Sequence, residues 1–348
     1  MAKVAVVGVV GRTNAGKSTL VNRLVGEKVS IVSPVEQTTR NTIRGIVEDP
    51  RGQLVLLDTP GLHKAVGELG RILNRMARRS AAGVDILCVV FDASEEPQLE
   101  DVGWMQRVAK ERPEKVVFVL NKADCKPFYE TMFREAWEET VEKLNVEELK
   151  SSESGANSDP ASRPSSLSTV QPFNLSTVQP FNLSTVQPFN RSTVQPVWLK
   201  AIATTEGGAN AVMDALFDFA EEGEALFDSD IVTDYPRKLT IADSIREKYL
   251  AKMHQEVPHE MGILVKDIAE GRSGWKVKVD VLVNRASQKP IVIGRGATTV
   301  KYVRKCAERE LSEMFGVKVE LEIWIRVEPN WMKNPKLLAE MGYMGDLV

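Results

Sequence analysis

Cysteine is scarce in this sequence, with three residues among 348. Cys88, Cys125 and Cys306 lie far apart, and no two of them have the short spacing of a zinc site. An odd number of widely separated cysteines also argues against a disulfide framework. We therefore expect a protein of a reducing compartment.

Long hydrophobic runs and an excess of either charge are also absent. The apolar stretch at 85–91 is far shorter than the roughly 20 residues of a membrane-spanning helix. A strand-like run begins at Val4, so no signal or transit peptide is expected before it. With a net charge of −3, any contact with RNA or a membrane must be local. We expect a cytoplasmic protein.

Apolar runs alternate with helical segments over residues 1–145. VAVVGVV, QLVLLD, DILCVVFD and KVVFVLNKAD are typical of parallel strands that are buried on both faces. The predicted fold class is therefore α/β. A strand and a helix expected within 197–225 complete this first domain.

A repetitive segment interrupts the first domain. LSTVQPFN occurs three times in tandem and is followed by the partial copy RSTVQP. A proline in every copy is incompatible with a helical face or a regular central strand. We predict a solvated, disordered insertion at 146–196, with a repeat that has a binding role as the alternative.

The second unit, at 235–348, has a different pattern. It predicts a helix at 240–254, strands at 262–268 and 275–283, an apolar run at 290–293, a helix at 298–314 and a strand at 317–327. This alternation indicates a compact α+β domain.

The stretch from Gly11 to Ser18, GRTNAGKS, lies between an apolar strand and a helical segment. This spacing predicts a phosphate-binding loop, whose backbone N–H groups face the α- and β-phosphates of a nucleotide. Lys17 would reach the β- and γ-phosphates, and Ser18 would bind Mg²⁺.

Two further motifs follow the phosphate loop along the chain. In Asp58-Thr-Pro-Gly61 the carboxylate can hold a water on Mg²⁺ and the glycine N–H can face the γ-phosphate. In Asn121-Lys-Ala-Asp124 the last carboxylate can accept hydrogen bonds from guanine, whereas adenine presents an acceptor there. Thr38 or Thr39 could be a further Mg²⁺ ligand; we favour Thr39, with an exposed polar loop as the alternative.

These motifs, with QTTR, DTPGLH, IGRGA and VEPNW, resemble the Era family of the TrmE–Era group of translation-associated GTPases. The resemblance covers the chain except for the insertion. It implies a P-loop Ras-like GTPase domain followed by a type II KH domain. It further implies GTP as substrate, Mg²⁺ as cofactor and a monomer that binds small-subunit ribosomal RNA near its 3′ end. Action in small-subunit biogenesis and peripheral contact with the bacterial inner membrane are implied as well.

Three positions qualify this resemblance. Leu62 stands where Ras-like enzymes have a water-orienting Gln, so slow intrinsic hydrolysis is expected. Related GTPases imply a K⁺ ion at Asn14, with simple capping of the loop as the alternative. Ala203 represents the fifth nucleotide motif without a neighbouring Ser, which puts the rigidity of that loop in question.

The candidate residues fall into three groups. The predicted catalytic residues are Lys17, Thr39, Asp58 and Gly61. The predicted nucleotide-binding residues are Gly11, Arg12, Thr13, Asn14, Ala15, Gly16, Lys17, Ser18, Asp58, Thr59, Pro60, Gly61, Leu62, Asn121, Lys122, Ala123, Asp124 and Ala203. The predicted RNA-binding residues are Gly294, Arg295, Gly296, Ala297, Lys301, Arg304 and Lys305.

The RNA-binding prediction depends on a second glycine loop, Gly294-Arg-Gly-Ala297, before a basic helix. A loop of this kind in a KH domain clamps about four nucleotides of single-stranded RNA. A solvated basic helix is the alternative. Ala297 replaces a glycine that the family usually has, which costs little only with helical φ and ψ angles.

Two other functions stay open from the sequence. One is a signalling GTPase whose C-terminal domain binds a protein, and the other is a regulatory member with weakened nucleotide binding. Trp275, Trp324 and Trp331 are predicted to pack within the KH domain rather than to stack on RNA bases.

Overall fold

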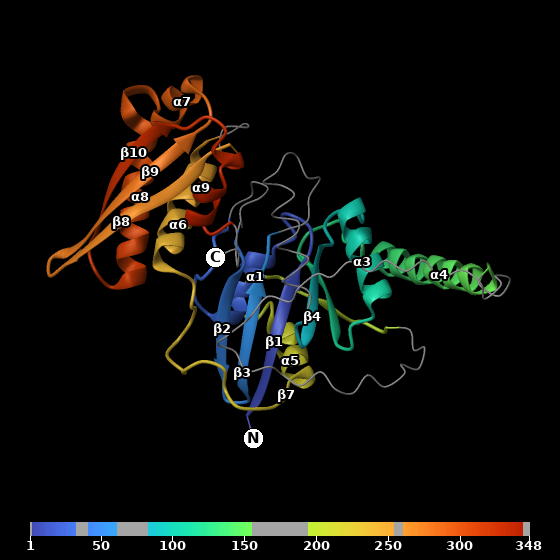
Figure 1. Cartoon of the computed structure of the whole chain (residues 1–348). Coiled ribbons are helices and arrows are strands. Elements are labelled where there is room, and N and C mark those ends of the chain that lie inside the picture. Colours follow the sequence, from blue (N-terminus) through green and yellow to red (C-terminus); the bar gives the residue numbers. More distant parts are fainter. Residues whose placement is uncertain (1, 33–40, 61–82, 155–193, 254–259, 344–348) are drawn as a thin grey trace, which may run out of the picture.

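The computed structural model describes residues 2–32, 41–60, 83–154, 194–253 and 260–343. They form an N-terminal α/β domain and a C-terminal α+β domain, which lie side by side in Figure 1. The α/β fold class that the sequence predicts is confirmed.

A seven-stranded sheet forms the centre of the first domain, in the order β2-β3-β1-β4-β5-β6, with β7 also paired to β1. Strand β2 is antiparallel to β3 and β7 is antiparallel to β1, whereas the remaining pairs are parallel. The strands are β1 (Lys3–Val10), β2 (Ile43–Asp49), β3 (Gly52–Asp58), β4 (Ile86–Asp92), β5 (Val116–Asn121), β6 (Val197–Lys200) and β7 (Glu221–Glu222). The carboxyl ends of the parallel strands therefore share one edge, where ligands of such sheets bind.

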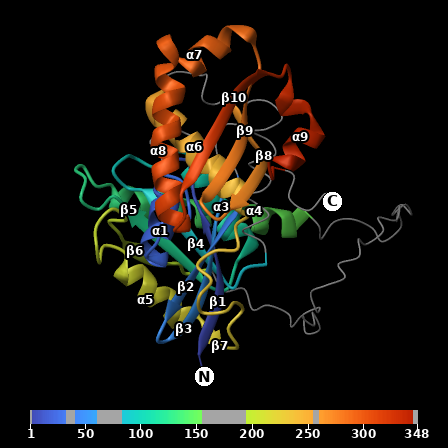
Figure 2. The same ribbon diagram turned by 90° about the vertical axis from the view of Figure 1, so that its left-hand side faces the viewer.

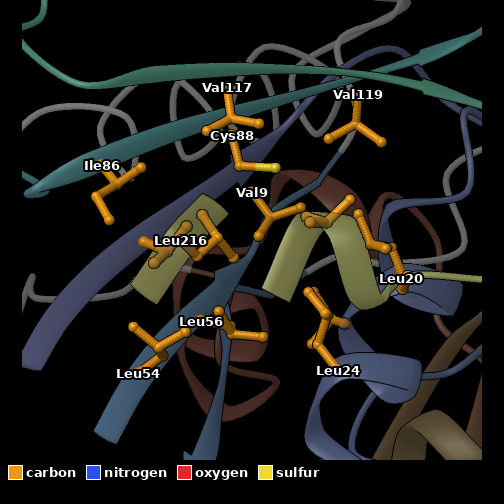
Figure 3. Packing of buried hydrophobic residues seen from close by; sticks show 14 of the residues in the cluster. Val9, Leu20, Leu24, Leu54, Leu56, Ile86, Cys88, Val117, Val119 and Leu216 are labelled. Atoms are coloured by element: carbon orange, nitrogen blue, oxygen red, sulfur yellow. The ribbon is translucent and has the colours of Figure 1, made fainter. Parts of the chain in front are cut away.

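Helices cover both faces of this sheet. Helices α1 (Lys17–Val25) and α5 (Asn210–Phe219) contribute to one core, which Figure 3 shows with Leu20, Leu24 and Leu216. Helices α3 (Leu99–Glu111) and α4 (Glu130–Ser154) contribute to the other core. Alternate residues of β4 point into the two cores, which explains why its sequence is continuously apolar.

Helix α4 continues to Ser154, past the start of the insertion predicted at residue 146. Residues 146–150, VEELK, favour a helix, so the end of the helix lies later than the predicted boundary at residue 146. Residues 155–193, which contain the repeats, lie outside the described residues. Strand β6 then pairs with β5 and extends the sheet.

A three-stranded sheet in the order β10-β9-β8 forms the second domain. Helices α6 and α8 pack on one face, and α9 covers part of the other, as Figure 2 shows. The apolar run at 290–293 is a short helix, because proline is favoured in a first helical turn. The elements are α6 (Arg237–Lys252), β8 (Gly262–Gly271), β9 (Gly274–Val283), α7 (Lys289–Ile293), α8 (Thr298–Phe315), β10 (Val319–Val327) and α9 (Pro335–Glu340).

Hydrogen bonds attach the linker between the domains to β2, at the edge of the first sheet, and to the adjacent β3. The side chain of Gln53 is buried, and its Oε1 accepts hydrogen bonds from the N–H groups of Leu226 and Phe227 at 2.8 and 3.0 Å. The N–H group of Ile46 donates to Val232 O at 2.8 Å. The second domain therefore begins from a fixed point on the first.

All three cysteines are free. Cys88 is fully buried in the first sheet, and this burial raises the pKa of its thiol to about 12. Within the described ranges, no helix combines the length and apolar character that crossing a bilayer requires.

Candidate functional sites

The phosphate loop joins β1 to α1, and its shape requires two glycines. Gly11 has φ 147°, and a Cβ atom there would lie 2.2 Å from Val90 O. Gly16 has φ 93°, and a Cβ atom there would lie 2.2 Å from Asn121 Nδ2. The two glycines of the motif are therefore imposed by neighbouring strand ends as well as by the expected ligand.

Lys17 is the first residue of α1 and is almost fully buried. Its Nζ donates a hydrogen bond to Arg12 O at 2.7 Å. Burial lowers the pKa of Lys17 to about 8, while the charge of Asp58 opposes this shift. An ammonium beside the N–H groups of a helix N-terminus forms a site for a phosphate chain.

Asp58 ends β3 and is completely buried near Ser18. Burial raises the pKa of Asp58, although the Ser18 hydroxyl and the Lys17 ammonium act to lower it. Within the described residues, neither carboxylate oxygen accepts a hydrogen bond of good geometry. A buried carboxylate with unmatched oxygens beside a hydroxyl fits the oxygen ligands that Mg²⁺ prefers.

Asn121 connects the phosphate loop to the fifth nucleotide motif. Its Nδ2 donates to Ala15 O at 2.9 Å, and its Oδ1 accepts from the N–H group of Ala203 at 3.2 Å. The Ala203 N–H group thus has a protein partner in this structure. Asp124, three residues further on, is exposed at the same sheet edge and is free to reach a base from solvent.

The fifth motif lacks its usual Ser, and an arginine of α1 contacts its backbone. The Arg23 guanidinium donates to the carbonyl groups of Ala203 and Thr204 at 3.4 and 3.1 Å. The N–H group of Ile202 donates to Gly208 O at 2.9 Å and closes the loop. These hydrogen bonds hold the loop of the fifth motif in place, although it lacks the usual Ser.

The second glycine loop joins α7 to α8, and three of its four residues have positive φ angles. Gly294 has φ 77°, and a Cβ atom there would lie 2.4 Å from Thr299 Oγ1. Gly296 and Ala297 both have φ 61°. Ala297 therefore has left-handed backbone angles, which are strained for alanine, and the favourable case with helical angles does not hold.

An open groove runs beside this loop. Its apolar side chains suit unpaired bases, and its cations suit a phosphate backbone. The lining residues are Ala286, Lys289, Pro290, Ile291, Ile293, Gly294 and Arg295. The basic residues expected on α8, Lys301, Arg304 and Lys305, are all exposed, and Lys301 Nζ also donates to Gly296 O at 3.4 Å.

Two protein families match this chain in succession. Residues 6–122 match the family described as 50S ribosome-binding GTPase, and residues 256–332 match the KH domain family. GTPase Era of Rippkaea orientalis is 31% identical over 337 residues, which cover 97% of this chain and 91% of that protein. GTPase Era of Lacticaseibacillus paracasei is 31% identical over 340 residues, with coverage of 97% and 95%.

The chain belongs to the Era family of GTPases. A crystal structure of Era in complex with MgGDPNP and nucleotides 1506–1542 of 16S ribosomal RNA has a TM-score of 0.76 to this chain. Its sequence identity is 26%, over 99% of both chains. A variant of Aquifex aeolicus Era bound to GDP·AlF4⁻ has a TM-score of 0.75 and 26% identity, over 98% of this chain and 99% of that one. The predicted order of a Ras-like GTPase domain and a KH domain is confirmed.

Several of the residues predicted from the sequence lie outside the described residues. They are Thr38, Thr39, Gly61 and Leu62. The structure brings the remaining predicted nucleotide-binding residues together at the carboxyl edge of β1, β3, β5 and β6. It places the predicted RNA-binding residues at the start of α8, in the other domain.

Contacts between the two domains flank residues 33–40 on both sides. Before this segment, Lys28 Nζ lies 2.7 Å from Glu247 Oε2 and 2.6 Å from Glu310 Oε1 of the KH domain. After it, Asn41 Nδ2 donates to the hydroxyl of Tyr235 at 2.8 Å, and this hydroxyl donates to Asp243 Oδ2 at 2.8 Å. We call these two sets of contacts the interdomain interface.

Sequence reasoning missed the interdomain interface, because its partners are up to 282 positions apart. The prediction for Trp324 was wrong, since its side chain on β10 is 67% exposed. It lies on the face of the sheet opposite α6 and α8, at an alternating position of the strand that points outward. Trp331 is buried against α9 residues, as the sequence predicts.

Proposed function

We propose that this chain is a GTP-hydrolysing switch that binds small-subunit ribosomal RNA near its 3′ end and acts in small-subunit biogenesis. The observation that carries the proposal is the similarity, over 99% of both chains, to Era in complex with MgGDPNP and a 16S RNA fragment. The proposal is also supported by a glycine loop before a helix in each domain, at Gly11 and at Gly294. Peripheral membrane contact stays a prediction.

In this proposal the nucleotide lies along the carboxyl edge of the first sheet. The N–H groups of the phosphate loop and the Lys17 ammonium bind the phosphates, and the negative phosphates favour the charged form of this buried lysine. Asp124 accepts from the edge of guanine, and Asn121 holds the phosphate loop and Ala203 in register. The proposed site comprises the nucleotide-binding residues named from the sequence.

Mg²⁺ fits the Asp58 site, which offers buried oxygens without good hydrogen bonds. Ser18 would bind it directly and Asp58 through a water, and Thr39 is the proposed third contact. When bound, the ion would neutralise charge that develops on the phosphate oxygens. We also propose K⁺ at Asn14, which has φ 62° in the phosphate loop.

Hydrolysis should be slow in the isolated protein. Leu62 has no polar atom that could orient an attacking water, so Lys17 and the loop N–H groups are left to stabilise the transferred phosphoryl group. Measured turnover of GTP by the parent, and its loss in Lys17→Ala, would test this part of the proposal.

The two domains are proposed to communicate through the interdomain interface. Thr39 is the proposed γ-phosphate-dependent residue, and it lies in the segment that Lys28 and Asn41 flank. A nucleotide that orders this segment would favour one placement of the KH domain, and hydrolysis would remove that preference.

RNA binding provides the direct test of the proposed function. We expect the parent to bind a labelled 16S 3′-end RNA more tightly than a scrambled RNA, and Arg295→Asp to reduce this binding. Fluorescence anisotropy at several salt concentrations measures both. Weak binding that ignores RNA sequence, salt and Arg295 would instead favour a protein partner for the second domain.

A further inference from the structure

A buried carboxylate lies at the end of β4 and belongs to none of the nucleotide motifs. Asp92 is 1% exposed, and its Oδ2 accepts a hydrogen bond from Lys122 Nζ. Its Oδ1 accepts from the hydroxyl and the N–H group of Ser94 at 2.5 and 3.1 Å. Burial opposes ionisation of Asp92, but the contacts with Lys122 and Ser94 outweigh it, so its pKa is lowered. The carboxylate is therefore charged at neutral pH.

A second cation reaches the same carboxylate from the phosphate loop. Arg12 Nη2 lies 3.4 Å from Asp92 Oδ2 and 2.7 Å from Glu95 Oε2, and Arg12 Nε lies 3.2 Å from Asp101 Oδ2. Asp92 thus contacts one residue of the phosphate loop and one residue of the base motif. Asp101 is equally buried and also pairs with Arg12, but the Lys122 ammonium pairs with Asp92.

Lys122 connects the contact with Asp92 to the proposed guanine site. Lys122 follows β5 with φ 60°, and its side chain is 36% exposed. Its ammonium reaches the end of β4, so its methylene stem spans the edge between the two strands. Asp124, the proposed guanine acceptor, is two residues away. The stem can form an apolar wall of the base site only while its charged end is held.

We propose that Asp92 is a positioning residue for guanine nucleotide binding, which holds Lys122 beside the base and Arg12 behind the phosphate loop. This inference rests on the proposed function and adds a residue that none of the motifs contains. Because a single carboxylate contacts both parts of the site, base binding and phosphate binding depend on each other through it.

The test is a double-mutant cycle on GDP affinity, measured with a fluorescent GDP analogue. Asp92→Asn keeps the shape and removes the charge, and we expect it to weaken binding about ten- to a hundredfold. In a Lys122→Met background the loss caused by Asp92→Asn should be at least about threefold smaller, because the contact is already missing. Asp49→Asn is the control, because Asp49 pairs with Arg51 at the opposite edge of the sheet, and its effect should be the same with and without Lys122→Met.

Equal losses from Asp92→Asn in both backgrounds would overturn the proposal and leave Asp92 a merely structural residue. Lys122→Met tests the same ion pair without altering a buried group, so it does not depend on folding of the Asp92 variant. It keeps the methylene stem, and parent-like GDP affinity for it would also overturn the proposal. A parent protein that binds no GDP would refute the proposed function itself, whereas binding without any Asp92 effect refutes only this inference.

Discussion

The two glycine loops of this chain both precede a helix, but the protein surrounds them differently. At the phosphate loop, missing Cβ atoms make room for Val90 and Asn121 of two neighbouring strands, and Lys17 is only 6% exposed. At the second loop, a Cβ atom at Gly294 would meet Thr299 of the following helix, and one at Gly296 would meet nothing within 4 Å. In the proposed function, several elements enclose the nucleotide and shape its loop, whereas RNA would cross a surface and meet exposed charges.

The largest effect should come from filling the enclosed loop. We expect Gly11→Ala to weaken GDP binding more than about a hundredfold, equivalent to about 3 kcal/mol, because its Cβ would collide with Val90 O. Titration with a fluorescent GDP analogue measures the loss. Gly26→Ala is the matched control, since Gly26 has φ 84° but open space around it. A GDP affinity of Gly11→Ala within about threefold of the parent value would show that crowding by neighbouring strands does not shape the phosphate loop.

The same substitution in the second loop separates the two sites. We expect Gly294→Ala to reduce affinity for the 16S 3′-end RNA by more than about tenfold and to leave GDP affinity unchanged, because Thr299 crowds only this loop. Gly296→Ala adds the same side chain in open space. It should lower the stability of the loop by only about 1–2 kcal/mol, through the strain of a left-handed alanine. Equal RNA affinities of the two variants, measured by anisotropy, would show that crowding at Gly294 is unimportant.

Exposed cations on α8, next to the second loop, should contribute to RNA binding in a salt-dependent way. Lys301→Ala should weaken RNA binding for all sequences and reduce the slope of log affinity against log salt by about 1. GDP affinity should not change, since Lys301 is exposed in the other domain. Lys318→Ala is the control, because Lys318 is exposed in the same domain but pairs with Glu320. An unchanged slope for Lys301→Ala would remove this residue from the RNA site.

The smallest effect concerns the strained alanine. Ala297→Gly should stabilise the KH domain by about 0.5–1 kcal/mol. Glycine adopts φ 61° without strain, and this gain exceeds the larger chain entropy that glycine loses on folding. Ala339→Gly, at an exposed position of helix α9, should instead destabilise it by about 1 kcal/mol. Urea unfolding followed by tryptophan fluorescence compares the two. Destabilisation by Ala297→Gly would mean that the left-handed angles carry no strain.

The sequence predicts the enclosed loop better than the open one, for a physical reason. Residues from Gly11 to Ser18 and from Asn121 to Asp124 are short motifs at strand ends, so a parallel sheet brings them together by its topology. The same reasoning could have found Asp92, which ends the strand beside β5. The backbone angles of Ala297 could not be predicted, because they depend on how the loop joins two helices.

Contacts between distant segments escape sequence reasoning altogether. Lys28 pairs with Glu247 and Glu310, and neither its spacing nor its neighbours in the sequence point to them. Similarly, an alternating apolar strand pattern predicts that β10 has a buried face but does not say what covers the other. Trp324 is exposed there because α9 covers the sheet only around Leu264 and Leu282.

The central claim is that nucleotide state and RNA binding depend on each other through the interdomain interface. The most direct measurement is the Kd of the 16S 3′-end RNA in the GTP-analogue state and in the GDP state, for the parent and for Lys28→Ala. The account predicts at least about a fivefold difference between the states in the parent, and a smaller difference in the variant. Equal RNA affinity of the parent in both nucleotide states would contradict it.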